Sequence, residues 1–205
     1  MARSPQATRL YSVDTTTGAA TPVADLVTTA GTPVVLSGSA FGVDVNPAAD
    51  AIRIVSDGGQ NLRVLPEDRV VEGTPRAKGT TFVDGTLNEG GFAETGVTAA
   101  AYTGNDTDPA TPTKLYVLDG DSGRLLVQDP PNAGTLTNPV ELRQWWSTEL
   151  TGFDIVTSGG TDTAYATLTK DRWDRSQLVK VDLATGKVHT LGRLPIDGGV
   201  RGITL

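Results

Sequence analysis

The sequence contains no cysteine and only one histidine, His189. The lack of cysteine excludes disulfides, thiol nucleophiles and cysteine metal sites. A single histidine cannot form the His cluster of a zinc centre. A Ser–His–Asp triad would have to use His189, and the Gly-x-Ser-x-Gly turn that often carries its serine is missing. The sequence therefore shows no catalytic signature, and it leaves open whether the protein is an enzyme.

Aromatic residues make up only 5% of the chain, and its formal net charge is -7. No stretch of the sequence forms a basic stripe. A nucleic-acid-binding protein would show such a stripe. No apolar run reaches the roughly 20 residues that a membrane helix needs, and the first ten residues hold no apolar core of a signal peptide. We predict no nucleic-acid partner and no membrane insertion.

Glycine and proline are plentiful, with 24 and 12 residues in a chain of 205. They are typical of many short strands joined by tight turns. The length suits one large all-β domain. The sequence predicts an all-β protein with a tail at residues 1–9 and a single domain at residues 10–205.

A hairpin pattern occurs three times as an alternating strand, then Asp-x-x-x-Gly, then a second strand. The aspartates are Asp14, Asp119 and Asp182, each followed four residues later by glycine. Aspartate can accept N–H groups of a turn, and glycine tolerates the positive φ that chain reversal needs. We interpret all three as turns between adjacent strands. Calcium binding at residues 119–123 is the alternative, although the later oxygen ligands of a calcium loop are missing.

Four apolar strands each contain a glycine at or near their start, and these glycines stand at positions 42, 96, 152 and 202. Further short strands follow the first three, for example residues 60–64 and 69–72. Four short strands in a repeat of this length are typical of a propeller blade. We predict a small β-propeller of about four four-stranded blades, or part of a five-bladed one. The glycine-containing strand that begins each repeat would be the innermost strand of its blade, because its residues are small.

The predicted repeats cover residues 10–38, 39–94, 95–149 and 150–199, and residues 200–205 form a closing strand. The chain begins with outer-type strands at residues 10–23 and ends with an inner-type strand. We therefore predict that the N- and C-terminal strands pair and close the ring, which would remove open sheet edges.

Polar side chains are densest in the second repeat, around Arg53 and Arg63. Arginine suits carboxylate or phosphate ligands, while the alternative is an Arg–Asp–Asn network that locks one blade to the next. Two inner-strand aspartates could bind a cation or act as an acid–base pair, or bond the backbone of a neighbouring blade. The candidate ligand-binding residues are Asp44, Asn46, Arg53, Gln60, Asn61, Arg63 and Asp154.

Several motifs resemble, in the same order, a bacterial family of unknown function, the domain-of-unknown-function family numbered 4394. They are Phe41 to Pro47, Asp50, Arg53 to Ser56, Gly59 to Arg63, Gly85 to Asn88, Ala99 to Thr103, Asp129 to Leu136, Gly152 to Ile155, and Tyr165 with Ala166. The resemblance implies a secreted or periplasmic, propeller-like protein with no assigned activity. Family members usually carry a further repeat and a half before the hairpin at Leu10.

These observations favour a non-catalytic extracytoplasmic module, extracellular or periplasmic, that binds a small molecule or a protein. One alternative is an enzyme, a lyase, cyclase or hydrolase, that uses the axial face of the propeller. Another is a structural or assembly protein, and a homo-oligomer is compatible with both. We predict no cofactor, with Ca²⁺ or another divalent cation as the alternative.

Overall fold

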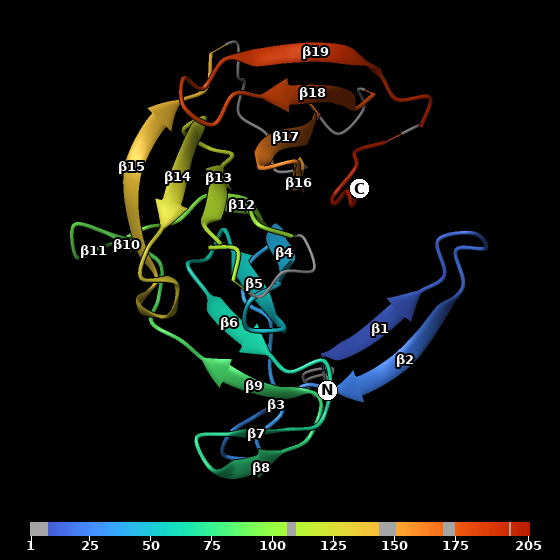
Figure 1. Cartoon of the computed structure of the whole chain (residues 1–205), viewed down its shortest axis with the longest axis vertical. Helices are drawn as coiled ribbons and strands as arrows, with labels where there is room; N and C mark the ends of the chain where they lie inside the picture. The colour runs from blue at the N-terminus through green and yellow to red at the C-terminus, as the bar shows by residue number, and fades with distance from the viewer. Residues whose placement is uncertain (1–7, 106–109, 144–150, 170–174, 197) are drawn as a thin grey trace, which may run out of the picture.

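The computed structural model describes residues 8–105, 110–143, 151–169, 175–196 and 198–205. Three sheets of four or more strands make up most of it, and two hairpins form small sheets of their own. The strands β4, β12 and β16 lie near the middle of the molecule, and β9, β15 and β19 lie at its edge (Figure 1). The all-β prediction is confirmed.

The first sheet has the order β3-β9-β6-β5-β4. Its strand β5, between β6 and β4, is buried along its whole length, which suits the β-branched residues that it contains. The bounds are β3 Val27–Thr28, β4 Phe41–Asn46, β5 Ala51–Ser56, β6 Asn61–Val64 and β9 Thr80–Val83.

One strand of this repeat was predicted in the wrong sheet. Residues 69–72 were expected beside residues 60–64, but β7 Arg69–Val71 pairs with β8 Thr74–Arg76 in a separate two-stranded sheet. β9 takes the expected place, antiparallel to β6. The short segments have similar strand propensity, so their partners depend on tertiary packing.

The second sheet has the order β11-β10-β15-β14-β13-β12. Its inner strand β12 is buried throughout and contains three consecutive alanines. The bounds are β10 Asn88–Glu89, β11 Phe92–Ala93, β12 Val97–Tyr102, β13 Leu115–Asp119, β14 Arg124–Gln128 and β15 Thr135–Glu141, and a short 3-10 helix, η1 Pro131–Ala133, precedes β15.

The third sheet is a four-stranded antiparallel meander with the order β16-β17-β18-β19. The bounds are β16 Thr151–Ser158, β17 Thr161–Leu168, β18 Gln177–Val181 and β19 Val188–Arg193. β12 contacts both β4 and β16, so the inner strands of the three sheets follow one another.

The core is divided among the sheets. One cluster, with Val55 and Leu126, joins the first sheet to the second. Another, with Leu118 and Ile155, joins the second to the third. Leu26 and Val34 cover the far face of the first sheet. Each fully buried aliphatic side chain stabilises the fold by roughly 1.5–3 kcal/mol, so these two interfaces hold the three sheets together.

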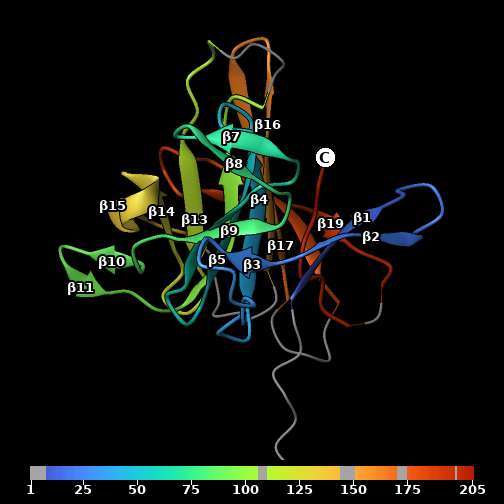
Figure 2. The same cartoon turned by 90° about the horizontal axis from the view of Figure 1, so that it is seen from below.

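The predicted pairing of the chain ends is wrong. β1 Arg9–Val13 pairs with β2 Ala20–Asp25 in a sheet of two strands, and residues 200–205 lie outside any strand. The hairpin projects from the opposite side of the molecule to β10 and β11, as both views show (Figures 1 and 2). Residues 200–205 instead run beside β16. Of the predicted tail, residues 1–7 lie outside the described residues and Arg9 begins β1.

The three Asp-x-x-x-Gly turns are confirmed. Each lies between adjacent antiparallel strands, and in each the glycine N–H donates to the aspartate carbonyl oxygen. The Asp14 side chain, for example, accepts the N–H groups of Thr16 and Thr17, and Gly18 has a φ of 71°. Local geometry therefore suffices to fix these turns.

Candidate functional site

The inner strands surround a small cavity of about 180 Å³. Its lining is mostly backbone and small residues of β4, β12 and β16, together with the segment that ends the chain. Arg201 is its one charged lining residue. The predicted axial candidates Asp44 and Asp154 lie on the strands that border this cavity but do not line it.

Asp44 and Asp154 perform the same task in two different sheets. Asp44 accepts the N–H of Tyr102 at 2.6 Å, from β12 of the next sheet, and the N–H of Val45. Asp154 accepts the N–H of Leu205 at 2.7 Å and that of Ile155. Each carboxylate thus joins its inner strand to the backbone beside it. This agrees with the interpretation that these aspartates bond neighbouring backbone.

Burial raises the pKa of Asp44 to about 6, despite two N–H donors that lower it, and repulsion from Asp154 adds a smaller increase. Burial also raises the pKa of Asp154, against the N–H groups of Leu205 and Ile155. A carboxyl group whose pKa is raised in the folded state stabilises the fold when protonated, and this stabilisation is lost as pH rises through that pKa.

We predict that the stability of the wild-type protein relative to Asp44→Asn falls as pH rises from about 4 to 6, by up to about 3 kcal/mol. Urea unfolding at several pH values measures this difference. Asp14→Asn is the control, because backbone N–H groups lower the pKa of Asp14. The stability of the wild-type protein relative to this variant should therefore rise as pH rises, and this change should occur below about pH 4. A pH-independent difference for Asp44→Asn would contradict the prediction.

The predicted arginine cluster exists, and its side chains bond to other groups of the protein. Arg53 is almost fully buried and donates at 2.8 Å to Asp84 and to Asn61, and at 2.7 Å to Asn132. Arg63 reaches the same Asp84 carboxylate at 3.3 Å and lies over the ring of Phe82. Asn132 belongs to η1, which connects β14 and β15 of the second sheet. The cluster therefore joins the first sheet to the second.

The structure brings together Arg53, Asn61 and Arg63 from the predicted set, but not the remaining polar residues of the same repeat. Asn46 accepts the N–H groups of Ala48 and Ala49 in its own turn. Gln60 bonds the backbone of Ser37 and Val35. Both side chains therefore shape loops.

Sequence reasoning missed several members of the arginine cluster. The sequence marked them only by residue type, because they lie 31 to 79 residues from Arg53 or Asn61, to which they bond. They are Asp84, Asn132, Gln128 and Tyr102, and the Oε1 of buried Gln128 has no hydrogen-bond partner.

Asp119, the centre of the alternative calcium loop, is engaged by protein groups. Its carboxylate accepts the N–H groups of Asp121 and Ser122 and bonds the Ser122 hydroxyl. Arg124 donates to it at 3.1 Å, and also to Glu89 and Glu94. Within the described ranges, no group of three or more His, Asp or Glu residues is placed to hold a metal ion.

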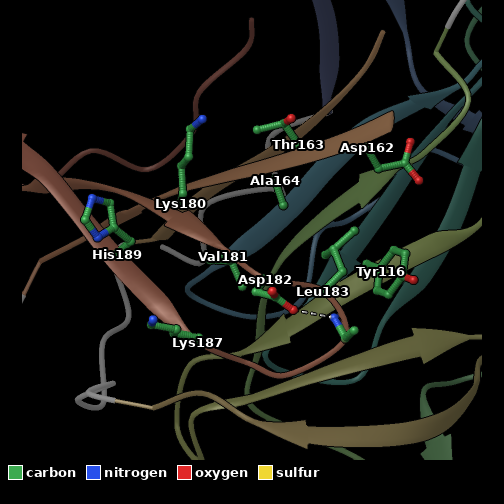
Figure 3. Close-up of a pocket in the computed structure, with 11 residues that line it drawn as sticks. Tyr116, Asp162, Thr163, Ala164, Lys180, Val181, Asp182, Leu183, Lys187 and His189 are labelled. Carbon is green, nitrogen blue, oxygen red and sulfur yellow. Dashed lines mark hydrogen bonds between the residues drawn. The ribbon is translucent and has the colours of Figure 1, made fainter. Parts of the chain in front are cut away.

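A larger cleft lies on the third sheet, with a volume of about 600 Å³. Figure 3 shows basic side chains on one side of it and Tyr116 with Leu183 on the other. The lining residues are Tyr116, Asp162, Thr163, Ala164, Lys180, Val181, Asp182, Leu183, Ala184, Lys187 and His189. Sequence reasoning named Asp182 only as a turn residue and considered His189 only for a triad.

The register of the third sheet explains why Lys180 and His189 lie side by side. Lys180 on β18 pairs with His189 on β19 and with Tyr165 on β17. Paired residues point to the same face of a sheet, and the Lys180 ammonium lies 5.2 Å from the centre of the Tyr165 ring. Residues two apart in a strand share a face, so Lys187 would share the face of His189.

The fold and the cleft define an all-β protein of several packed sheets, with a small-molecule-sized hollow on the third sheet. The chain belongs to the family described as a domain of unknown function, DUF4394, whose model matches residues 4–204. The family resemblance seen in the sequence is thereby confirmed. No helix among the described residues is long and apolar enough to cross a membrane.

No curated protein matches the chain. Among solved structures, it is similar to a candidate 6-phosphogluconolactonase from Bacteroides uniformis ATCC 8492, with 13% identity and a TM-score of 0.41. The match covers 92% of this chain and 64% of that one. Similarity at this level bears on neither the fold nor the activity of this chain.

Proposed function

We propose that this chain is a non-catalytic ligand-binding module that works outside the cytoplasm, and that its ligand occupies the cleft on the third sheet. The volume of about 600 Å³ lies within the range of small-molecule sites. The extracytoplasmic location rests on the family resemblance alone.

The observation that carries the proposal is the difference between the two polar clusters. In the arginine cluster, Arg53 is 2% exposed and its donors are used by the protein. In the cleft, Lys180, Lys187 and His189 are exposed, so their polar atoms are accessible to a ligand. The cleft is therefore the better binding site.

We further propose that the sheets are blades of a propeller-like array around the axial cavity. Two equivalent contacts support this. Gly42 lies against the backbone of Ala99 and Ala100, while Gly152 lies against that of Gly202 and Ile203. Two residues later in each strand, Asp44 and Asp154 accept the N–H of Tyr102 and of Leu205. Residues 202–205 thus lie where the inner strand of a fourth blade would be.

An enzyme acting through the axial face is less well supported. Its carboxylates would be Asp44 and Asp154, yet each already accepts two backbone N–H groups. The prediction of no cofactor, with a divalent cation as its alternative, stays a prediction, as do the alternatives of an assembly role and a homo-oligomer.

The test is to fill the cleft. We expect small fragments detected by ¹H–¹⁵N NMR to shift the amide signals of Leu183 and Ala184. Ala184 is exposed at the rim of the cleft, so Ala184→Trp should block the site without disturbing the core. The affinity of these fragments should then fall at least about tenfold, which equals about 1.4 kcal/mol.

Ala48→Trp provides the matched control, because Ala48 is exposed in a turn of the first sheet and does not line the cleft. This variant should retain fragment affinity within about twofold. The proposal would be wrong if fragments shifted signals elsewhere, or if both tryptophan variants bound them equally well.

A further inference from the structure

The two carboxylates that line the cleft accept hydrogen bonds from the chain itself, whereas its lysines can only donate. Asp182 Oδ1 accepts the N–H groups of Ala184 and Thr185 at 3.0 and 2.8 Å. Asp162 Oδ1 accepts the hydroxyl of Thr157 at 2.6 Å. Lysine only donates, and among the described residues neither Lys180 nor Lys187 forms a salt bridge. A ligand that binds these lysines must therefore bring acceptors.

The donors gather at one end. Lys180 and His189 are cross-strand partners, and Lys187 comes two residues before His189, immediately before β19 begins. Lys187 is attracted to Asp182 but makes no ion-pair contact with it in the described structure. An anion placed beside these three side chains would meet two ammonium groups and an imidazole in a chain whose net charge is -7.

The other side of the cleft holds most of its apolar area, together with the carboxylate of Asp162. Tyr116 and Leu183 pack against the cluster that joins the second and third sheets, and Ala164 and Val181 belong to that cluster. Figure 3 shows Tyr116 and Leu183 across the cleft from Lys187 and His189. An aromatic or aliphatic body lying there would remove apolar area from water, which favours binding.

We infer that the ligand is a small amphipathic anion. Its carboxylate or phosphate lies beside Lys180, Lys187 and His189, and its apolar body lies against Tyr116 and Leu183. This inference rests on the proposed function, because it names the chemical class of ligand for the same cleft.

Four probes separate the two halves of the inference: naphthoate, naphthalenemethanol, naphthylmethylammonium and inorganic phosphate. Equilibrium binding is measured by NMR titration of the full chain. Naphthoate should bind at least about fivefold more tightly than each of the other three. Lys180→Gln/Lys187→Gln should weaken naphthoate at least about fivefold, because it removes both ammonium groups proposed to face the carboxylate, and leave naphthalenemethanol within about twofold.

The matched control is Lys78→Gln/Lys114→Gln, which removes the same charge at two exposed lysines outside the cleft. It should change naphthoate affinity by no more than about twofold. A general effect of net charge would instead weaken binding equally in both double variants, and that result would overturn the inference.

The remaining outcomes are also decisive. Equal binding of naphthoate and the alcohol, both blocked by Ala184→Trp, would refute an anionic ligand while leaving a binding cleft. Phosphate binding as tightly as naphthoate would refute the role of the apolar area. Failure of all four probes would overturn the ligand class, and the fragment experiment would decide separately whether the cleft binds ligands.

Discussion

Replacing Asp84 with alanine is expected to lower the free energy of unfolding by about 3–5 kcal/mol, because it leaves a buried guanidinium without its carboxylate. The side chains of Arg53 and Asp84 are only 2% and 8% exposed, and their ion pair measures 2.8 Å. The remaining partners of Arg53 are neutral: Asn61, Asn132 and the Tyr102 hydroxyl at 3.4 Å.

Urea unfolding checks this expectation, with an unchanged slope showing that both states keep their compactness. Asp25→Ala is the control, since Asp25 pairs with Arg9 in an exposed salt bridge, with side chains 51% and 45% exposed. That variant should lose far less stability than Asp84→Ala, because solvent screens an exposed ion pair. Losses of similar size in the two variants would contradict the role of the buried network.

A second variant separates the charge from the lost contacts. Arg53→Met/Asp84→Asn removes both charges, so it should be less destabilised than Asp84→Ala if the uncompensated charge causes the loss. A larger loss in the double variant would instead assign the stabilisation to the hydrogen bonds that join η1 to the first sheet.

Local features were predictable from the sequence because their causes lie within a few residues. The aspartate of each Asp-x-x-x-Gly turn bonds N–H groups two and three residues later. β4 likewise begins and ends where its sequence pattern predicted, at Phe41 and Asn46. No distant partner is needed for either feature.

Features that depend on distant partners were not predictable in the same way. The strand pattern at residues 69–72 could not show that β9 would displace it beside β6. Residues 200–205 were recognised as equivalent to an inner strand, and they do lie against β16, yet they form no ladder there. The hairpin of β1 and β2 forms a sheet of its own, and in the described structure no ladder joins it to residues 200–205.

The candidate site shows the same division. Arg53, Asn61 and Arg63 were grouped correctly because neighbouring strands of one hairpin carry them. Their main acceptor, Asp84, lies 31 residues beyond Arg53. The cleft escaped notice because Tyr116 belongs to the second sheet, and because Lys180 and His189 meet only through the register of β18 and β19.

Replacing Gly42 with alanine is the other change with a large expected effect. A Cβ at this position would lie 2.5 Å from the carbonyl carbon and 2.8 Å from the Cα of Ala99. Real Cβ atoms essentially never approach backbone this closely, and β12 is buried along its whole length, so neither strand can move aside cheaply. We expect a loss of about 3 kcal/mol or more, at the upper end for overpacking, measured by urea unfolding.

Gly152→Ala should behave differently although the local geometry is similar. Its Cβ would lie 2.8 Å from the backbone of Gly202 and of Ile203, but residues 200–205 are only partly buried and form no ladder. This segment can move away, so the global loss should be smaller than for Gly42→Ala, although the buried Thr167 hydroxyl, which accepts the Gly152 N–H at 2.8 Å, also lies close to the added Cβ. The Leu205 N–H, which donates to Asp154, should instead lose its protection from hydrogen exchange. Equal losses of unfolding free energy in the two variants would show that residues 200–205 are as firmly packed as β12. Retained protection of the Leu205 N–H would show that its hydrogen bond to Asp154 does not depend on Gly152.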